Sequence, residues 1–297
     1  TCFTVWAMPY QSLLMEMTPD YNERTRVTEV RGYFQTLAGF LNGWLWWITL
    51  RPLFFVTEPA TGEFVASTSN GMRYVSLAIA VIILVGGVIP AIFVKERYYE
   101  QVRRHQKKIG LLTSLKQTLS NRAFLILCIF IVFFLLGTAI FDSYGRYVGT
   151  YYVLGGDWDR GAVFAGWGTL VYTIFSLGFI PIFRRLSERI GKNRCLALSV
   201  FVVLLSASST WWTFTPECPW LMLINTALIG AGYAGLWLML PSMQVDVVDY
   251  DELKTGQRRE GSFASIFSWI LKLSFCVGFL ISGPLLELTG FDASLAG

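Results

Sequence analysis

Long apolar stretches alternate with shorter polar segments along almost the whole chain. An apolar helix of about 20 residues is long enough to cross the hydrocarbon core of a bilayer. The pattern therefore predicts seven complete membrane-spanning helices, at residues 31–50, 73–94, 123–154, 161–183, 195–214, 220–243 and 263–283. Residues 1–15 have the pattern of the last part of another such helix, so we expect the chain to be a fragment of a longer protein.

The polar segments fall into two alternating sets that differ sharply in charge. The segments at 16–31, 95–122, 184–194 and 246–261 contain 19 of the 24 lysines and arginines, whereas the intervening segments contain four. Positive residues concentrate on the cytoplasmic side of membrane proteins, so the first set is predicted to be cytoplasmic. The one remaining basic residue is Lys272, which lies inside a predicted span.

The composition supports this assignment. Of the 297 residues, 54% are hydrophobic and only 15% are charged, whereas soluble domains contain about 25% charged residues. The single histidine, His105, lies among lysines and arginines, so a metal site or a catalytic triad has little to be built from. We expect an all-α, multi-pass protein of the inner or plasma membrane, with no metal, no nucleic-acid partner and no enzymatic activity.

Three ionisable residues in or next to predicted spans are candidates for function, because charges inside a bilayer are costly. Lys272 lies in the middle of its helix, and the alternative is a structural lysine bonded to backbone carbonyls. Asp142 is the only carboxylate well within a span, and a local pair with Arg146 at i+4 is its alternative. Arg31 lies at the inner end of its helix, where an ordinary flanking charge is equally expected.

Two further groups of residues have the chemistry of a solute site. Tyr10 and Gln11 form a polar patch beside Pro9, which frees a backbone carbonyl in the first predicted helix. Trp237 lies deep in a glycine-rich helix. On spacing alone, this tryptophan is more typical of packing than of ligand binding.

The sequence Asp-Tyr-x-Glu occurs twice, at residues 20–23 and 249–252, each time after an apolar stretch that contains a proline. Such a repetition indicates parallel repeats, which are common in transporters. We expect these motifs to lie in cytoplasmic loops and to form ion pairs that close an inner gate; solvated charged loops are the alternative. The candidate gate residues are Asp20, Glu23, Arg24, Asp246, Asp249 and Asp251. A membrane-embedded enzyme that holds a metal at the second motif stays a remote alternative.

Both motifs resemble those of a known transporter family. Pro9-Tyr-Gln-Ser-Leu-x-x-Glu-Met-Thr-x-Asp-Tyr-x-Glu-Arg-Thr25 and Asp246-x-Val-Asp-Tyr-x-Glu-x-Lys-Thr-Gly256-x-Arg are similar to segments of the glycoside–pentoside–hexuronide:cation symporter family. This family belongs to the major facilitator superfamily and includes the melibiose permease. The segment 184–194 also resembles the superfamily's short loop motif.

The resemblance implies a twelve-helix, two-bundle transporter that couples a solute to Na⁺, H⁺ or Li⁺ by alternating access. The chain would run from about the fourth helix through the eleventh. Residues 1–94 would then be part of the N-terminal bundle, 95–122 the cytoplasmic central loop, and 123–297 part of the C-terminal bundle.

Some family positions are kept in this chain and others are changed. Arg31, Trp237, Ser268 and Lys272 match residues of the family's solute cavity, as the resemblance implies. Ala7 stands where the melibiose permease has an aspartate that serves both sugar and cation, and Gln11 stands where it has an aromatic residue that stacks on the sugar.

These changes lead us to expect H⁺ rather than Na⁺ as the coupling cation. Asp142, which has no family counterpart, is a candidate replacement carboxylate together with Lys272. We therefore expect a symporter for a sugar, glycoside or hexuronide, monomeric in the lipid membrane and without a cofactor other than this cation. A transporter of an amphiphilic or lipid-like solute is the alternative.

Overall fold

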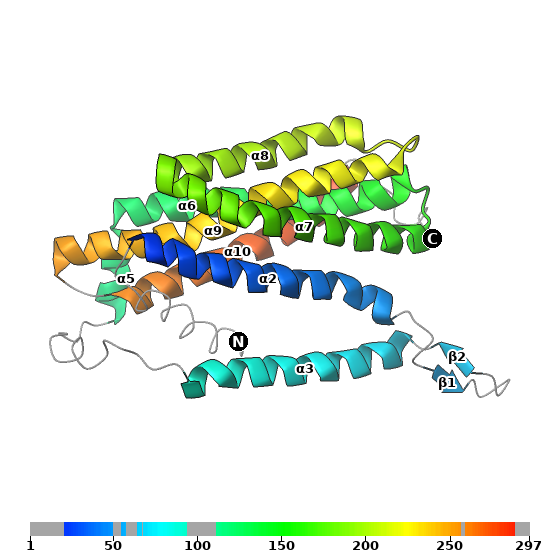
Figure 1. Cartoon of the computed structure of the whole chain (residues 1–297), viewed down its shortest axis with the longest axis horizontal. Coiled ribbons are helices and arrows are strands. Elements are labelled where there is room, and N and C mark those ends of the chain that lie inside the picture. The colour runs from blue at the N-terminus through cyan, green and yellow to red at the C-terminus, as the bar shows by residue number, and fades with distance from the viewer. Residues whose placement is uncertain are drawn as a thin grey trace.

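The computed structural model describes residues 21–49, 55–57, 64–66, 68–93, 111–256 and 259–288. Within them, long helices run roughly side by side (Figure 1). They are α2 (Tyr21–Thr49), α3 (Thr68–Phe93), α6 (Arg122–Tyr147), α7 (Trp158–Ile190), α8 (Lys192–Thr213), α9 (Met222–Thr255) and α10 (Glu260–Leu288).

The remaining elements are short. Helix α5 (Leu111–Leu119) precedes α6, a π-helical segment η1 (Val148–Val153) continues α6, and a single 3₁₀ turn η2 (Pro219–Leu221) leads into α9. Strands β1 (Phe55–Thr57) and β2 (Phe64–Ala66) form an antiparallel hairpin in the connection between α2 and α3. The architecture is thus helical, as predicted, with this hairpin as an addition that the sequence analysis did not foresee.

The helices have the length and composition of membrane spans. Six of those that the structure describes are long and apolar enough to cross a membrane, namely α3, α6 with η1, α7, α8, α9 and α10. Helix α2 contains 29 residues, but its outer part is rich in Gly, Trp, Thr and Asn, which lowers its hydropathy. The prediction of a multi-pass membrane protein is confirmed.

The predicted boundaries of the cytoplasmic segments were wrong at three places, because the helices continue past the apolar stretches. Helix α2 already begins at Tyr21, α7 extends to Ile190 and α9 extends to Thr255. A helix satisfies its own backbone hydrogen bonds in lipid and in water, so it does not need to end where the apolar stretch ends. Gly256 ends α9 with a left-handed backbone (φ 63°), a conformation that glycine adopts at helix C-termini.

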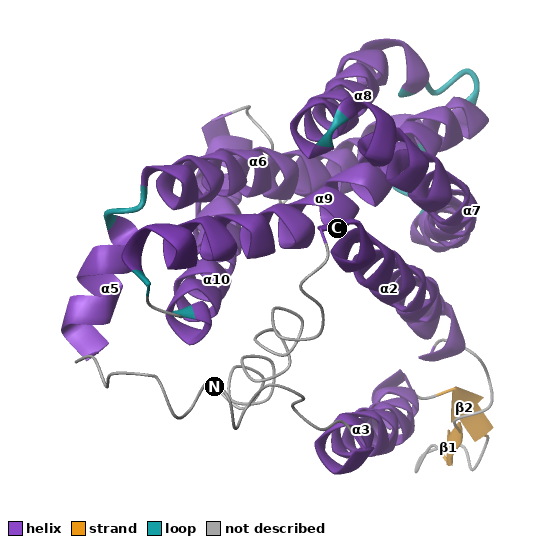
Figure 2. Cartoon of the chain, turned by 60° about the vertical axis from the view of Figure 1, so that its left-hand side comes forward, coloured by secondary structure: helices purple, strands orange, loops and turns teal. Residues whose placement is uncertain are grey.

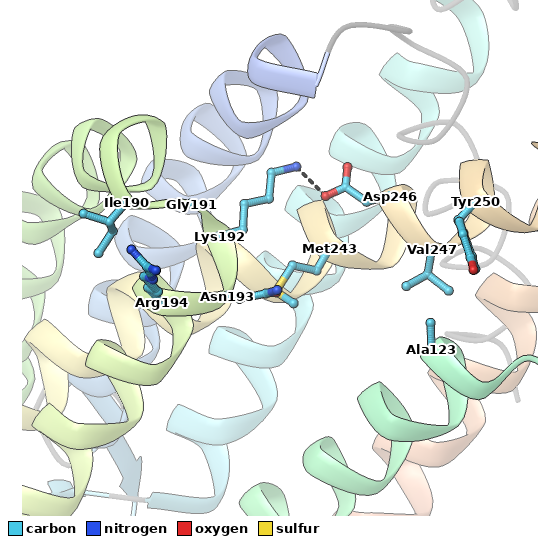
Figure 3. A pocket seen from close by; sticks show the side chains of 10 residues that line it. All are labelled: Ala123, Ile190, Gly191, Lys192, Asn193, Arg194, Met243, Asp246, Val247 and Tyr250. Carbon is cyan, nitrogen blue, oxygen red and sulfur yellow. Dashed lines mark hydrogen bonds and ion pairs between the residues drawn. The ribbon is translucent and has the colours of Figure 1, made fainter.

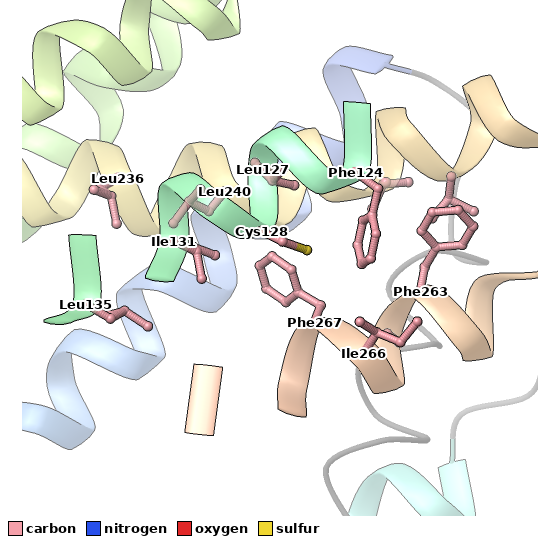
Figure 4. Close-up of a cluster of buried hydrophobic side chains, with 13 residues drawn as sticks. Phe124, Leu127, Cys128, Ile131, Leu135, Leu236, Leu240, Phe263, Ile266 and Phe267 are labelled. Atoms are coloured by element: carbon pink, nitrogen blue, oxygen red, sulfur yellow. The ribbon is translucent and has the colours of Figure 1, made fainter. Parts of the chain in front are cut away.

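Helices α6, α9 and α10 share an apolar core towards the ends that the sequence predicts to be cytoplasmic (Figure 4). The rings of Phe124 and Phe263 meet edge to face at 4.8 Å, and further along the same two helices Ala139 lies against Gly278. These two contacts show that α6 and α10 run parallel. Helix association in lipid relies on van der Waals packing and small residues, and this register provides both.

Helix α9 lies at the centre of the described helices. It packs against α7 and α8 along most of its length, and α2 packs on α7 and α9 from the other side. Figure 2 shows α2 between α3 and the group that contains α6 to α10. The surface where α2 meets α7 and α9, which we call the α2 seam, therefore joins two groups of helices.

Candidate functional site

An ion pair crosses the α2 seam near the end that the sequence predicts to be cytoplasmic. Arg184 Nη1 on α7 donates to Glu29 Oε2 on α2 at 3.1 Å, and the two side chains are 26% and 11% exposed. The other oxygen of Glu29 accepts from the Tyr33 hydroxyl at 3.1 Å, and Arg184 Nε lies 3.6 Å from Glu188 on its own helix. Because water is largely excluded from the Glu29 side, this pair is stronger than an ordinary surface pair.

Hydroxyl pairs extend the polar character of the α2 seam on both sides of this ion pair. Thr25 Oγ1 lies 3.2 Å from Ser242 Oγ on α9, and both side chains are buried. Thr36 Oγ1 lies 3.3 Å from Ser176 Oγ on α7. The described contacts across the seam therefore include an ion pair and hydroxyl pairs. These contacts can break when the helices move apart, and water can then hydrate the separated groups.

Two of the predicted gate residues have partners among the helices that follow α5. Asp246 on α9 accepts from Lys192 Nζ at the start of α8 at 2.7 Å. Asp251, also on α9, pairs with Arg259, and both side chains are nine-tenths buried.

The Asp251–Arg259 pair belongs to a wider network. Arg259 Nε donates to Asp251 Oδ2 at 3.1 Å, and Arg259 Nη1 donates to Gln117 Oε1 on α5 at 2.7 Å. Asn121, the N-cap of α6, donates to Asp251 Oδ1 at 3.1 Å. The network thus joins α5, α6, α9 and the start of α10.

The other predicted gate residues are placed as follows. Glu23 is exposed on the first turn of α2, and Asp249 is half-buried on α9. Asp20 and the side chain of Arg24 lie outside the described residues. The described members of the two motifs lie on helices rather than in loops, which corrects the expected local structure, whereas their role in a gate stays a prediction.

Polar side chains from three helices meet towards the outer half of the group α6 to α9. The ring of Tyr233 on α9 lies edge to face against Tyr172 on α7, with centroids 6.4 Å apart, and its hydroxyl shares a hydrogen bond with Thr138 on α6. Asp142 lies one turn beyond Thr138 on the same helix. Arg146 donates to the backbone carbonyl of Asp142 at 3.4 Å.

The structure places the predicted solute residues on several helices. Arg31 on α2, Trp237 on α9 and Lys272 on α10 are half-buried, and Ser268 is buried one turn before Lys272. Trp237 packs against the core shared by α6, α9 and α10. Tyr10 and Gln11 lie outside the described residues, so their role, like that of the other four, stays a prediction.

Metal ligands do not cluster in the part of the chain that the structure describes. No group of three or more His, Cys, Asp or Glu side chains there is close enough to hold a metal ion.

Sequence analysis did not single out the residues that make the clearest contacts. Arg184 was counted only among the basic residues of the segment 184–194, Glu29 was not considered, and nothing in the sequence pairs residues that lie 155 positions apart. Tyr172 and Tyr233 carried a weak signal, since each is a polar aromatic residue inside a predicted span.

Comparison with known proteins covers almost the entire chain. Residues 1–296 match the family model described as "MFS/sugar transport protein". The uncharacterized symporter YnaJ of Bacillus subtilis is 25% identical over 301 residues, which cover 99% of this chain and 60% of the relative.

Two relatives have names that state a solute. The glucuronide carrier protein homolog of Escherichia coli is 26% identical over 99% of this chain and 60% of its own length. The isoprimeverose transporter of Lactiplantibacillus pentosus is 25% identical over 97% of this chain and 57% of its own length. The chain therefore spans about three fifths of the length of these relatives, and their names describe transporters rather than enzymes.

Proposed function

The chain belongs to the MFS/sugar transport protein family, and from this premise we propose that its protein carries a sugar, glycoside or hexuronide across the membrane together with a cation. Transport occurs by alternating access, in which two groups of helices separate first on one side of the membrane and then on the other. The observation that carries this proposal is the Glu29–Arg184 pair, because it joins α2 to α7 across the seam between such groups.

The strength of this pair suits a contact that is made and broken in every transport cycle. A hydrogen bond to a charged group contributes about 1.5–3 kcal/mol net. A difference of about 1–3 kcal/mol changes an equilibrium between two states about 5- to 150-fold. The pair is therefore strong enough to favour contact at the cytoplasmic end, and weak enough for solute and cation binding to reverse that preference.

The charges near the α2 seam and on α10 favour an anionic solute. Arg31 and Lys272 are cations on different helices, and each suits a sugar carboxylate such as that of a hexuronide. A glucuronide carrier homolog among the relatives supports this choice. Trp237 provides an apolar ring of the kind that stacks on a pyranose face, and Ser268 provides a hydroxyl.

We propose H⁺ as the coupling cation, bound at Asp142. Position 7 has alanine where the resemblance implies a cation-binding carboxylate, and Asp142 supplies a carboxylate within an apolar span. Arg146 on the same helix donates to the backbone carbonyl of Asp142, and Tyr172 on α7 and Tyr233 on α9 pack on each other. Protonation cancels the charge of Asp142. This lowers the free-energy cost of placing the Asp142 side chain in an apolar environment during the transport cycle.

Uptake by cells that make the intact protein tests this function. Labelled phenyl glucuronide and labelled phenyl glucoside should both be offered, with Na⁺ present or replaced by choline, and with or without a protonophore. We expect glucuronide accumulation that survives the loss of Na⁺ and collapses with the protonophore. Lys272→Ala should abolish accumulation at unchanged expression. If neither compound is taken up above the level of empty cells, sugar transport is refuted. Uptake that resists the protonophore and depends on Na⁺ would refute only the choice of cation.

A further inference from the structure

The middle of α9 is buried except at two aromatic residues. Residues 230–240 are buried apart from Tyr233 and Trp237, which are partly exposed. These two residues are four positions apart, so their side chains follow one another on one face of the helix, about 6 Å apart along its axis. Trp237 belongs to the solute site that we propose above, whereas Tyr233 does not.

This aromatic face of α9 is turned away from α8. A Cβ on Gly232 would lie 2.6 Å from Val203, so the backbone of α9 touches α8 there. Near the other end of the same contact, Figure 3 shows Lys192 extended from α8 to Asp246 on α9. At about 100° per residue, Trp237 lies about 140° around the helix from Gly232 and about 180° from Asp246. Helix α8 therefore covers the opposite face of α9.

Two neighbouring helices fix the Tyr233 ring without stacking on it. Phe134 on α6 meets this ring at 5.9 Å and 63°, and Tyr172 on α7 meets it at 6.4 Å and 85°, so both contacts are edge to face. Tyr172 is itself held in place, because Gly230 has no side chain and lets the backbone oxygen of Tyr172 lie against α9. The Tyr233 ring is thus positioned from two sides and stays partly exposed.

We propose that Tyr233 is a specificity-determining residue that contacts the second ring of a two-ring glycoside, with Tyr172 as its positioning residue. This inference rests on the proposed function, in which Trp237 stacks on the first pyranose ring. The rise of about 6 Å from one residue to the other is comparable with the spacing of neighbouring rings in a glycoside. A tyrosine presents both an apolar ring and a hydroxyl group, so it suits a phenyl ring or a second sugar. A solute with one ring would reach Trp237 alone.

Competition for uptake measures this preference in cells that make the intact protein. The labelled solute is methyl glucuronide, which has one ring. The unlabelled competitors are methyl glucuronide, phenyl glucuronide and a disaccharide of glucuronic acid and glucose. We expect wild type to bind a two-ring competitor about three- to tenfold more tightly than methyl glucuronide, which is the size of effect that an aromatic pair has.

Substitutions at Tyr233 separate ring contact from packing. Tyr233→Leu should remove the two-ring advantage and leave the affinity for methyl glucuronide unchanged, whereas Tyr233→Phe, which keeps the ring, should retain most of the advantage. The competitor that loses its advantage shows whether the second ring is a phenyl ring or a sugar. Tyr172→Leu is the second variant, should Tyr233→Leu fail to fold, and it should reduce the advantage because Tyr233 loses one of its ring contacts.

Phe133→Leu is the matched control, since it removes an exposed aromatic ring from α6 and should leave all affinities unchanged. The proposal is overturned if wild type binds all three competitors equally, if Tyr233→Leu keeps the two-ring advantage, or if it weakens all three competitors alike, as a packing defect would. Absence of any uptake above that of empty cells would refute the proposed function and this inference with it, so the two failures are distinguishable.

Discussion

Replacing Glu29 with Gln removes the charge of the carboxylate from the α2 seam while keeping its size. Arg184 then loses its partner on α2 and keeps Glu188 on its own helix, 3.6 Å away. If the Glu29–Arg184 pair forms only while the cytoplasmic ends are in contact, the substitution destabilises that state alone. Its hydrogen bond is charged and partly screened, so we expect a loss of about 1–3 kcal/mol, which is about a 5- to 150-fold shift towards the separated state.

Spin-label distances across the seam measure this shift. Labels at Arg26→Cys on α2 and Arg189→Cys on α7, both exposed, should be introduced into a background without the five native cysteines. Pulsed electron–electron double resonance then gives the populations of short and long distances between the two spin labels. We expect wild type to favour the short distance and Glu29→Gln to favour the long one.

Two further variants sharpen the result. Glu188→Gln removes a charge next to Arg184 without crossing the seam, so its distance distribution should stay close to that of wild type. In a double-mutant cycle, Glu29→Gln with Arg184→Gln should shift the populations less than the sum of the two single substitutions. Distributions that are identical in wild type and both single variants would refute the assignment of this pair to a gate.

Other parts of the structure yield further predictions. Asp142→Asn should abolish solute accumulation driven by a pH gradient, while solute exchange, measured by counterflow of labelled solute, persists. Unchanged accumulation would exclude this carboxylate as the proton-coupling site. Gly230→Ala should lower Tm by an amount equivalent to about 1–3 kcal/mol, because its Cβ would lie 2.7 Å from a backbone oxygen of α7, whereas Gly137→Ala, with no atom within 4 Å, should not. Asp251→Asn should cost about 3–5 kcal/mol because Arg259 is left buried without its charged partner, and adding Arg259→Gln should restore part of the loss in a thermal melt.

The sequence predicted the helices well because the constraint that produces them is local. An apolar stretch of sufficient length in a bilayer must close its own backbone hydrogen bonds, whatever surrounds it. The ends of α7 and α9 were misplaced for the same reason, since the hydropathy pattern reports contact with lipid and not the end of the helix. A glycine follows each of these ends, Gly191 after α7 and Gly256 after α9, but Gly256 lies ten residues beyond the first charge of the motif.

Contacts between distant residues could not be predicted in this way. The pairing of Glu29 with Arg184 depends on which face α2 turns towards α7, and the chain contains many other charges at helix ends. Asp246 and Asp251 looked like equivalent members of one motif. Five residues apart on a helix, however, they point in different directions, so one meets Lys192 on α8 and the other meets Arg259.

The network around Arg259 has a mechanical consequence. It fastens α5, α6, α9 and α10 to one another at the cytoplasmic end, so stiffness is concentrated on one side of the α2 seam. Helix α9 contains 34 residues and is therefore about 50 Å long, which makes it a lever arm for the helices attached to it. A tilt of about 10° would displace its far end by about 9 Å over that length. A small rotation at the fastened end would thus produce a large movement at the far end of α9, which is the kind of motion that the proposed alternating access requires.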